Sequence, residues 1–263
     1  MLERGWVVVA TDYPGLGGPG VHPYLVGDVT GRSVIDSVRA ARALDSGLEL
    51  DDRYAVWGES QGGHAALFTG QVATEGYAPE LRLLGVGAAA PATDLAPLLK
   101  AAQGAPAGKV LTSQAVVSWT QIHPELSFDD AVARRARAPV QAIARRCLFP
   151  NFFVVAAQTI LIPKRMLAID ITTAPRWSAR LAENTPSGRI DAPVLLAQGQ
   201  RDQVVSPPVQ RAYVARRCAA GQPIDFRELP GSGHVDVMGA AGPILLDWTD
   251  RLFAGTPVPE GCA

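Results

Sequence analysis

The sequence lacks any marked excess of charge. Its 263 residues carry 24 basic and 25 acidic side chains, which leaves a formal net charge of −1 at pH 7. Proteins that bind DNA or RNA use clustered positive charge to neutralise phosphates. Because this chain has no excess of positive charge, no nucleic-acid partner is expected. Long polar or low-complexity tracts are also missing, and 48% of the residues are hydrophobic, which excludes an intrinsically disordered chain.

Long hydrophobic runs are absent as well. The most apolar windows, at residues 6–10, 83–91 and 152–162, are all shorter than the roughly 20 residues that a membrane-spanning helix needs. The first four residues, Met1-Leu2-Glu3-Arg4, show neither the basic start nor the apolar stretch of a signal peptide. No transmembrane segment is predicted, and nothing in the pattern indicates an oligomeric state.

Cysteine is scarce, yet two of the three cysteines occupy positions typical of a disulfide bond that holds a chain terminus. Cys262 lies one residue from the end of the chain, and Cys218 is in a loop-like Cys-Ala-Ala-Gly stretch. A disulfide between Cys218 and Cys262 would tie down the tail and indicates a secreted protein. Cys147 is then left free or paired with a cysteine upstream of Met1. Three free thiols in a cytosolic protein are the alternative.

The chain does contain a repeated pattern of strand, turn and helix. A helical periodicity at residues 31–44 predicts an amphipathic helix. A run at residues 224–229 alternates polar and apolar side chains and predicts a strand nearer the sheet edge. The pattern as a whole predicts an α/β fold with a mostly parallel sheet flanked by helices. Apolar runs predict buried parallel strands at residues 6–11, 54–57, 83–90 and 194–198.

The alternation of predicted strands and helices stops after residue 91 and resumes with the strand predicted at residue 194. Because helical spacing dominates the stretch between, we predict a core of residues 1–91 and 187–263 and a helical cap insertion at residues 92–186. A cluster of arginines in this insertion either binds an anionic partner or forms a solvated helix face, and we assign it no function. The cluster comprises Arg134, Arg135, Arg137, Arg145 and Arg146.

One stretch predicts a catalytic nucleophile. An apolar strand runs into Gly58-Glu59-Ser60-Gln61-Gly62 and then into a helix of small residues, which is the context of a nucleophile elbow. We expect Gly58 and Gly62 to lack side chains because chain segments crowd there, and Ser60 to adopt a strained backbone conformation that exposes its hydroxyl. The helix that follows directs the positive end of its dipole at an oxyanion forming there.

A serine hydroxyl needs an imidazole to take its proton and an acid to orient that imidazole. His234 follows the last predicted strand, on a loop at its C-terminal end, where such a base belongs. His64 follows Ser60 by one helical turn and is expected to be a buried structural residue. His22 and His123 are minor candidates.

Asp202 is the predicted acid, because it lies in the turn after the strand at residues 194–198. Asp236 is its chief rival, whereas Asp191 and Asp225 lie at strand starts, the wrong end of the sheet. The sequence has no metal-ligand spacing and no Gly-x-Gly-x-x-Gly at a strand-to-helix junction, so no cofactor is expected.

The order Ser60, Asp202, His234 and the surrounding motifs resemble the α/β-hydrolase superfamily, and more narrowly the secretory lipase family. The resemblance rests on residues 3–15, on residues 58–65 and on the turns that carry Asp202 and His234. It implies a serine carboxylic-ester hydrolase, a lipase or esterase that acts on small-molecule or lipid acyl esters through an acyl-enzyme. It also implies that the helical insertion is similar to the cap that covers the family's acyl-binding tunnel.

The same resemblance implies an oxyanion hole formed by Asp12 and by the backbone N–H of Gln61. A simple turn role for Asp12 is the alternative. Two other functions stay open for the chain: a serine peptidase or amidase with the same triad, and an inactive hydrolase-fold protein that binds a partner or a lipid.

One departure from the family pattern concerns the first predicted strand. In the superfamily a further strand lies between the strands that residues 6–11 and 54–57 resemble, and here it would precede residue 1. We therefore expect an N-terminally incomplete core with weak or no activity, unless residues 6–11 pair directly with residues 54–57. A signal peptide would belong to the same segment, so secretion is inferred.

Overall fold

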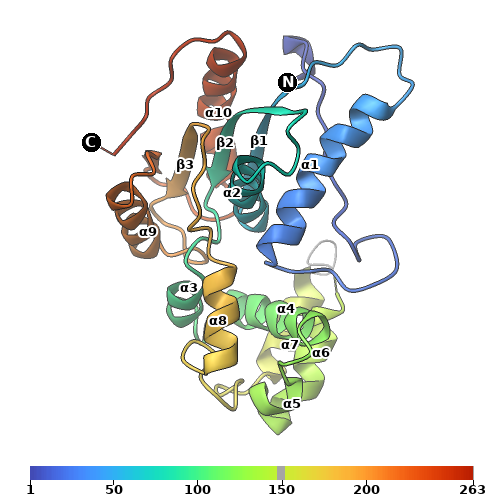
Figure 1. Cartoon of the computed structure of the whole chain (residues 1–263). Coiled ribbons are helices and arrows are strands. Elements are labelled where there is room, and N and C mark those ends of the chain that lie inside the picture. Colours follow the sequence, from blue (N-terminus) through green and yellow to red (C-terminus); the bar gives the residue numbers. More distant parts are fainter. Residues whose placement is uncertain (147–151, 263) are drawn as a thin grey trace. The chain divides into compact units, whose positions relative to one another are not determined.

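The computed structural model describes residues 1–146 and 152–262, with only the backbone described at residues 152, 153 and 156. The chain forms two compact units (Figure 1). The first contains Met1–Tyr13, Gly27–Asp94 and Pro186–Ala263, and the second contains Pro14–Val26 and Leu95–Thr185. Cys147 lies outside the described residues.

Residues 14–26 fall in the second unit, although the sequence places them in the core. The reason is a set of hydrogen bonds to one helix of that unit. Trp119 Nε1 donates to the carbonyl of Tyr24 at 2.8 Å, and the Tyr24 N–H donates to Ser118 Oγ at 3.0 Å. These contacts join residues more than 90 positions apart, so the local pattern does not reveal them.

A four-stranded parallel sheet organises the first unit, in the order β1-β2-β3-β4. Four of the five predicted strands are thereby confirmed, and β4 forms one edge as predicted. All six residues of β3 are buried, as expected for a parallel strand covered on both faces. The strands are β1 (Arg53–Glu59), β2 (Arg82–Ala89), β3 (Val194–Gly199) and β4 (Asp225–Leu229).

Helices cover both faces of this sheet. On one face, Leu196 of β3 packs in a buried cluster with Leu67 of α2 and Tyr213 of α9. On the other, Leu195 packs in a second cluster with Leu245 of α10. The predicted helix at residues 31–44 is confirmed as α1 and begins four residues earlier, at Gly27. The helices are α1 (Gly27–Ala43), α2 (Gln61–Thr74), α9 (Pro207–Ala219) and α10 (Val237–Phe253), and a short 3-10 helix, η1 (Leu2–Arg4), precedes them.

The predicted strand at residues 6–11 does not form. The segment has no regular secondary structure, and among the described residues the outer edge of β1 has no partner strand. Trp6 lies against Trp57 and Phe253, with ring centroids 6.4 and 5.7 Å away, but Val8 is 52% exposed. A strand needs a neighbour to satisfy its N–H and C=O groups, so high β propensity alone does not form one here.

The second unit is helical. Its core includes Val116, Trp119 and Ile143, and the rings of Trp119 and Trp177 stack with centroids 6.3 Å apart. No helix in the described part of the chain is long and apolar enough to cross a membrane. The helices are α3 (Leu95–Ala101), α4 (Pro106–Ile122), α5 (Phe128–Ala131), η2 (Arg134–Ala136), α6 (Arg137–Ala144), α7 (Phe152–Leu161) and α8 (Pro175–Glu183).

The predicted disulfide joins Cys218, near the end of α9, to Cys262. The two α-carbons are 5.6 Å apart, within the range that a disulfide requires. Gly261 makes the approach of the tail possible, because a Cβ at this position would lie 1.9 Å from the carbonyl oxygen of Ile224. The tail is therefore held beside the start of β4.

Candidate active site

Ser60 lies at the turn between β1 and α2, in a conformation that non-glycine residues seldom adopt. Its φ is 53° and its ψ is −114°. The Ser60 N–H donates to the carbonyl of Ala89 at 2.9 Å, and the Ser60 carbonyl accepts from the N–H groups of His64 and Ala92 at 3.0 and 3.2 Å. The surrounding main chain thus holds the strained residue in place, as the elbow motif predicts.

The glycines of the elbow do not share one role. A Cβ at Gly58 would lie 1.9 Å from the carbonyl oxygen of Gly62, so no side chain fits there. The expectation for Gly62 is wrong, because a Cβ at that position meets no atom within 4 Å. The second crowded position is Gly63, where a Cβ would lie 2.9 Å from the Cβ of Pro91. The segment that follows β2 therefore approaches α2 at Gly63, one residue later than the motif predicts.

His234 links the serine to a carboxylate. Its Nε2 lies 3.0 Å from Ser60 Oγ, and its Nδ1 lies 2.8 Å from Asp202 Oδ2. The three residues follow the carboxyl ends of β1, β3 and β4. Parallel strands end at the same edge of a sheet, which explains how residues so distant in sequence meet. The Asp202 side chain is fully buried and that of His234 is 16% exposed.

Four groups contact the Asp202 carboxylate. Oδ1 accepts from the N–H groups of Val204 and Val205, both at 2.8 Å. Oδ2 faces His234 and also accepts from Gln198 Nε2 at 3.1 Å. Such a set of contacts fixes the orientation of the carboxylate toward His234.

Gln198 is the residue of this site that the sequence analysis missed. It is fully buried at the end of β3, and its Nε2 also donates to the carbonyls of Gly199 and Val205 at 3.2 and 3.1 Å. Its Oε1 is buried with no hydrogen-bond partner among the described residues. The available signal was one polar side chain in the otherwise apolar run Val-Leu-Leu-Ala-Gln-Gly.

The rival candidates have other contacts. Asp236 Oδ1 accepts from the N–H of Gly233 at 2.7 Å, so this residue shapes the loop that carries His234. Asp191 and Asp225 pair with Arg189 and Arg227 near the starts of β3 and β4. His64 is fully buried against the ring of Phe68, with centroids 4.8 Å apart. His22 and His123 belong to the helical unit.

Comparison with known proteins gives the chain its family. Residues 1–261 match the family described as secretory lipase. The chain belongs to the secretory lipase family. Over its whole length it is 28% identical to Lipase 2 of Candida albicans, and over 99% of its length it is 26% identical to the secreted triacylglycerol lipase LIP4 of Malassezia globosa. The chain covers 58% of the length of each of these curated relatives.

A solved structure shows the same fold. Candida antarctica lipase A in its closed state matches 99% of this chain, with a TM-score of 0.79 and 19% sequence identity. The match covers 61% of that protein. The first unit therefore has the α/β-hydrolase fold, as the sequence predicts.

The two residues expected to form the oxyanion hole have different surroundings. Gln61 opens α2 directly after Ser60, so its backbone N–H lies at the positive end of the helix dipole. Asp12 is exposed, and within the described part of the chain its carboxylate has no hydrogen bond or ion pair. The segment that carries Asp12 is not fixed by a sheet, so its place in the oxyanion hole stays a prediction.

A second carboxylate lies close enough to the triad to interact with it. Burial raises the pKa of Glu59, the charge of His234 lowers it, and the negative charge of Asp202 raises it. Glu59 immediately precedes Ser60 at the end of β1. Among the described residues, no group of three or more His, Cys, Asp or Glu side chains is arranged to hold a metal ion.

Proposed function

We propose that this chain carries the catalytic site of a serine carboxylic-ester hydrolase, similar to a triacylglycerol lipase, with Ser60, His234 and Asp202 as its triad. The observation that carries the proposal is the continuous hydrogen-bonded series from Ser60 Oγ through His234 to Asp202 Oδ2. Membership of the secretory lipase family, and a relative named as a secreted triacylglycerol lipase, favour acyl esters as the substrate class.

In the proposed mechanism, His234 Nε2 takes the proton of Ser60 Oγ while Oγ attacks the ester carbonyl carbon. Asp202 holds the imidazole in the required tautomer and stabilises its positive charge. The backbone N–H of Gln61, with Asp12 as second donor, would stabilise the oxyanion. The alcohol leaves with the proton from His234, and water then hydrolyses the acyl-enzyme with His234 as base again.

Secretion belongs to the same proposal. The Cys218–Cys262 disulfide supports it, because disulfides persist in oxidising compartments. The family and the secreted Malassezia relative point the same way.

Fluorophosphonate labelling tests the proposal directly, because the reagent reacts with an activated serine. We expect labelling of the native chain and none of Ser60→Ala, while Ser37→Ala, which alters a half-buried serine on α1, labels normally. On p-nitrophenyl esters, Ser60→Ala should lower kcat by about 10⁶. Hydrolysis of aminoacyl anilides in preference to these esters would instead indicate a peptidase or amidase.

An inactive, ligand-binding hydrolase fold is the second candidate. The exposure of Asp12 favours it, because the segment that carries this residue is not held by a sheet in the part of the chain that the structure describes. A folded chain that neither takes the label nor hydrolyses any ester would support this second candidate.

A further inference from the structure

Helix α7 of the helical unit has no charged residue in its ten positions. Its two faces differ in burial. Val155, Thr159 and, just after the helix, Ile162 are buried, and their spacing of three and four residues places them on one face. The other face, which we call the α7 face, is exposed. It consists of Val154, Ala157, Ile160 and Leu161.

The α7 face is apolar throughout. Ile160 is 82% exposed, Leu161 is 69% exposed and Val154 is 45% exposed. A helix at the surface of a globular protein normally turns polar side chains outward. Apolar side chains that are exposed next to one another indicate a surface that binds something with an apolar part of its own.

The chain on both sides of α7 is exclusively basic. Residues 131–169 include seven basic residues and no acidic one, although the whole protein has a net charge of −1. Among the described residues, only Arg137 of this set forms an ion pair, with Asp129. The set contains the arginine cluster to which the sequence pattern assigns no function. Its members are Arg134, Arg135, Arg137, Arg145, Arg146, Lys164 and Arg165.

Four of these residues lie next to α7, and we call them the flanking cations. Arg145 and Arg146 directly follow α6, which packs against α7. Lys164 and Arg165 follow the last residue of α7 by three and four positions, so the α-carbons of Lys164 and Leu161 are at most about 11 Å apart. All four side chains are exposed, as a surface for an anionic partner requires.

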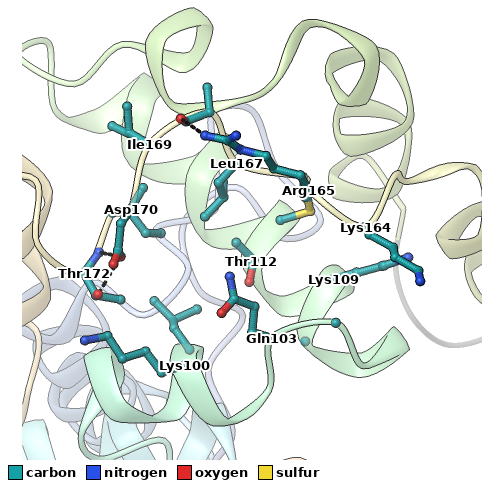
Figure 2. A pocket seen from close by; sticks show the side chains of 16 residues that line it. Lys100, Gln103, Lys109, Thr112, Lys164, Arg165, Leu167, Ile169, Asp170 and Thr172 are labelled. Atoms are coloured by element: carbon teal, nitrogen blue, oxygen red, sulfur yellow. Dashed lines mark hydrogen bonds between the residues drawn. The ribbon is translucent and has the colours of Figure 1, made fainter.

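The C-terminal end of α7 is fixed among basic side chains. Lys109 Nζ donates to the carbonyls of Thr159 and Ile162 at 3.1 and 2.9 Å. Lys109, Lys164 and Arg165 line the same pocket, and in Figure 2 the Lys109 and Lys164 side chains extend to the same side of it. Cations at this end also complement the negative end of the helix dipole. The α7 face therefore ends in a region of positive charge.

Charge and shape together favour one kind of partner. A second copy of the chain would bring the same basic residues together, and like charges repel. A soluble polyanion would match the flanking cations but leave the α7 face in water. An anionic lipid layer offers negative headgroups and hydrocarbon beneath them. With ten residues α7 is too short to cross such a layer, and an apolar helix face bordered by basic residues is typical of helices that lie in the headgroup region.

We propose that the α7 face and the flanking cations dock the chain on the surface of a lipid layer that contains anionic headgroups. The apolar side chains enter the headgroup region, and the cations pair with the negative charge around them. The proposal uses no residue of the proposed triad. Docking is therefore expected whether the chain is an ester hydrolase or an inactive binding protein.

Co-sedimentation with vesicles of dialkyl ether phospholipids tests the proposal, because these lipids contain no acyl ester to occupy or react at Ser60. We expect the chain to bind vesicles with about a third of ether phosphatidylglycerol at least about tenfold more tightly than vesicles of ether phosphatidylcholine alone. Salt at about 0.5 M should remove most of this difference, since it screens exposed charges. Equal binding to both kinds of vesicle would overturn the proposal.

A pair of apolar variants locates the surface. Ile160→Ser combined with Leu161→Ser should weaken binding to the anionic vesicles by about tenfold or more, because it removes apolar area that enters the layer. Leu44→Ser combined with Leu48→Ser is the control, since these leucines are 68% and 63% exposed but belong to the first unit. The control should bind like the native chain. If the double substitution in α7 unfolds the protein, Ile160→Ser alone provides a milder variant.

A charge-matched pair of variants tests the flanking cations. Arg145→Gln combined with Arg146→Gln should weaken binding to the anionic vesicles by about tenfold and leave binding to phosphatidylcholine vesicles unchanged. Arg42→Gln combined with Arg251→Gln removes the same charge from exposed positions of the first unit and should have little effect. Equal losses in the two variants would show unspecific attraction and overturn the proposal.

Two further measurements address the other partners. A dimer in sedimentation velocity that Ile160→Ser with Leu161→Ser dissociates would show that a second copy covers the α7 face. Heparin that binds as tightly as the anionic vesicles, and equally well to that variant, would identify a soluble polyanion instead. Either result would overturn the proposal. Fluorophosphonate labelling reports on Ser60 separately, so the proposed function and lipid docking can fail independently.

Discussion

Gln198 Nε2 lies 3.1 Å from Asp202 Oδ2, the same carboxylate oxygen that faces His234. The glutamine is fully buried, and its amide N–H groups point to three acceptors while its Oε1 has no partner in the described part of the chain. A buried acceptor without a partner destabilises a fold by about 1–3 kcal/mol. We interpret Gln198 as a positioning residue that holds Asp202 toward His234.

Replacing Gln198 by Met keeps the bulk of the side chain and removes its donors. Because a hydrogen bond to a charged group is worth about 1.5–3 kcal/mol, kcat on an ester should fall roughly 10- to 100-fold with little change in KM. The downfield proton resonance of His234 Nδ1–H should shift or broaden, which reports on the Asp202 contact without any turnover.

Gln210→Met is the matched control. Gln210 is equally buried in the same unit, but its amide donates to the carbonyl of Pro91 at 3.0 Å, and it has no contact with the triad among the described residues. If both variants lose activity equally and the resonance stays unchanged in both, Gln198 has only a structural role.

Asp202→Asn should lower kcat by about 10⁴, since the amide favours the wrong tautomer of His234. Asp236→Asn should be far milder, because Asp236 contacts the backbone of the loop rather than the imidazole. Steady-state rates on one p-nitrophenyl ester compare the two directly. A larger loss for Asp236→Asn would identify Asp236 as the acid.

Two glycine substitutions four residues apart should differ sharply in stability. Gly58→Ala forces a Cβ against the Gly62 carbonyl and should lower the free energy of unfolding by about 3 kcal/mol or more. Gly62→Ala meets no atom and lies in α2, where alanine favours the helix by up to about 1 kcal/mol. Urea denaturation of both variants measures the difference, and similar losses would contradict the close approach at Gly58.

The Cys218–Cys262 disulfide should stabilise the first unit. It closes a loop whose ends are 44 positions apart, for which the chain-entropy relation gives about 3–4 kcal/mol. The Cys218→Ser and Cys262→Ser variants should unfold at lower urea concentration than the oxidised chain, and each should match the reduced native chain. A midpoint that dithiothreitol does not alter would show that the bond does not form in solution.

His123 should make stability depend on pH. Burial, with a smaller contribution from the charge of Arg180, lowers the pKa of His123 in the folded chain. The unfolded chain then binds the proton more readily, so stability is complete above the ordinary histidine pKa of about 6.5 and decreases as pH falls below it. The melting temperature should drop between pH 7.5 and 5.5 by less in His123→Phe than in the native chain. An equal drop in both proteins would exclude His123 as the source.

The sequence predicts best those features that are encoded locally. The elbow around Ser60 and the turns that carry Asp202 and His234 follow from strand-to-turn patterns, and the order of strands then brings the three side chains together. Gln198 has a partner that no pattern specifies, because a polar residue in an apolar strand can face either side. The pairing of Tyr24 with Trp119 is equally invisible to local spacing.

Residues 6–11 show the limit of this approach most plainly. Their composition is typical of a buried strand, and a strand exists only where another one runs beside it. The prediction for Gly62 is wrong for a similar reason. The path of a distant segment, here the chain at Pro91, decides which glycine of an elbow has no room for a side chain.

The outer edge of β1, which has no partner strand among the described residues, has a consequence for this chain in concentrated solution. A sheet edge with no partner is a template on which another molecule can add a strand. Residues 6–10, whose Trp6 lies against Trp57 of β1, form an uncharged Trp-Val-Val-Val-Ala segment with three valines that are 40–52% exposed. Segments of this composition self-associate readily. The solubility and colloidal stability of this chain therefore depend on what covers the outer edge of β1, and not only on how well the interior of the protein is packed.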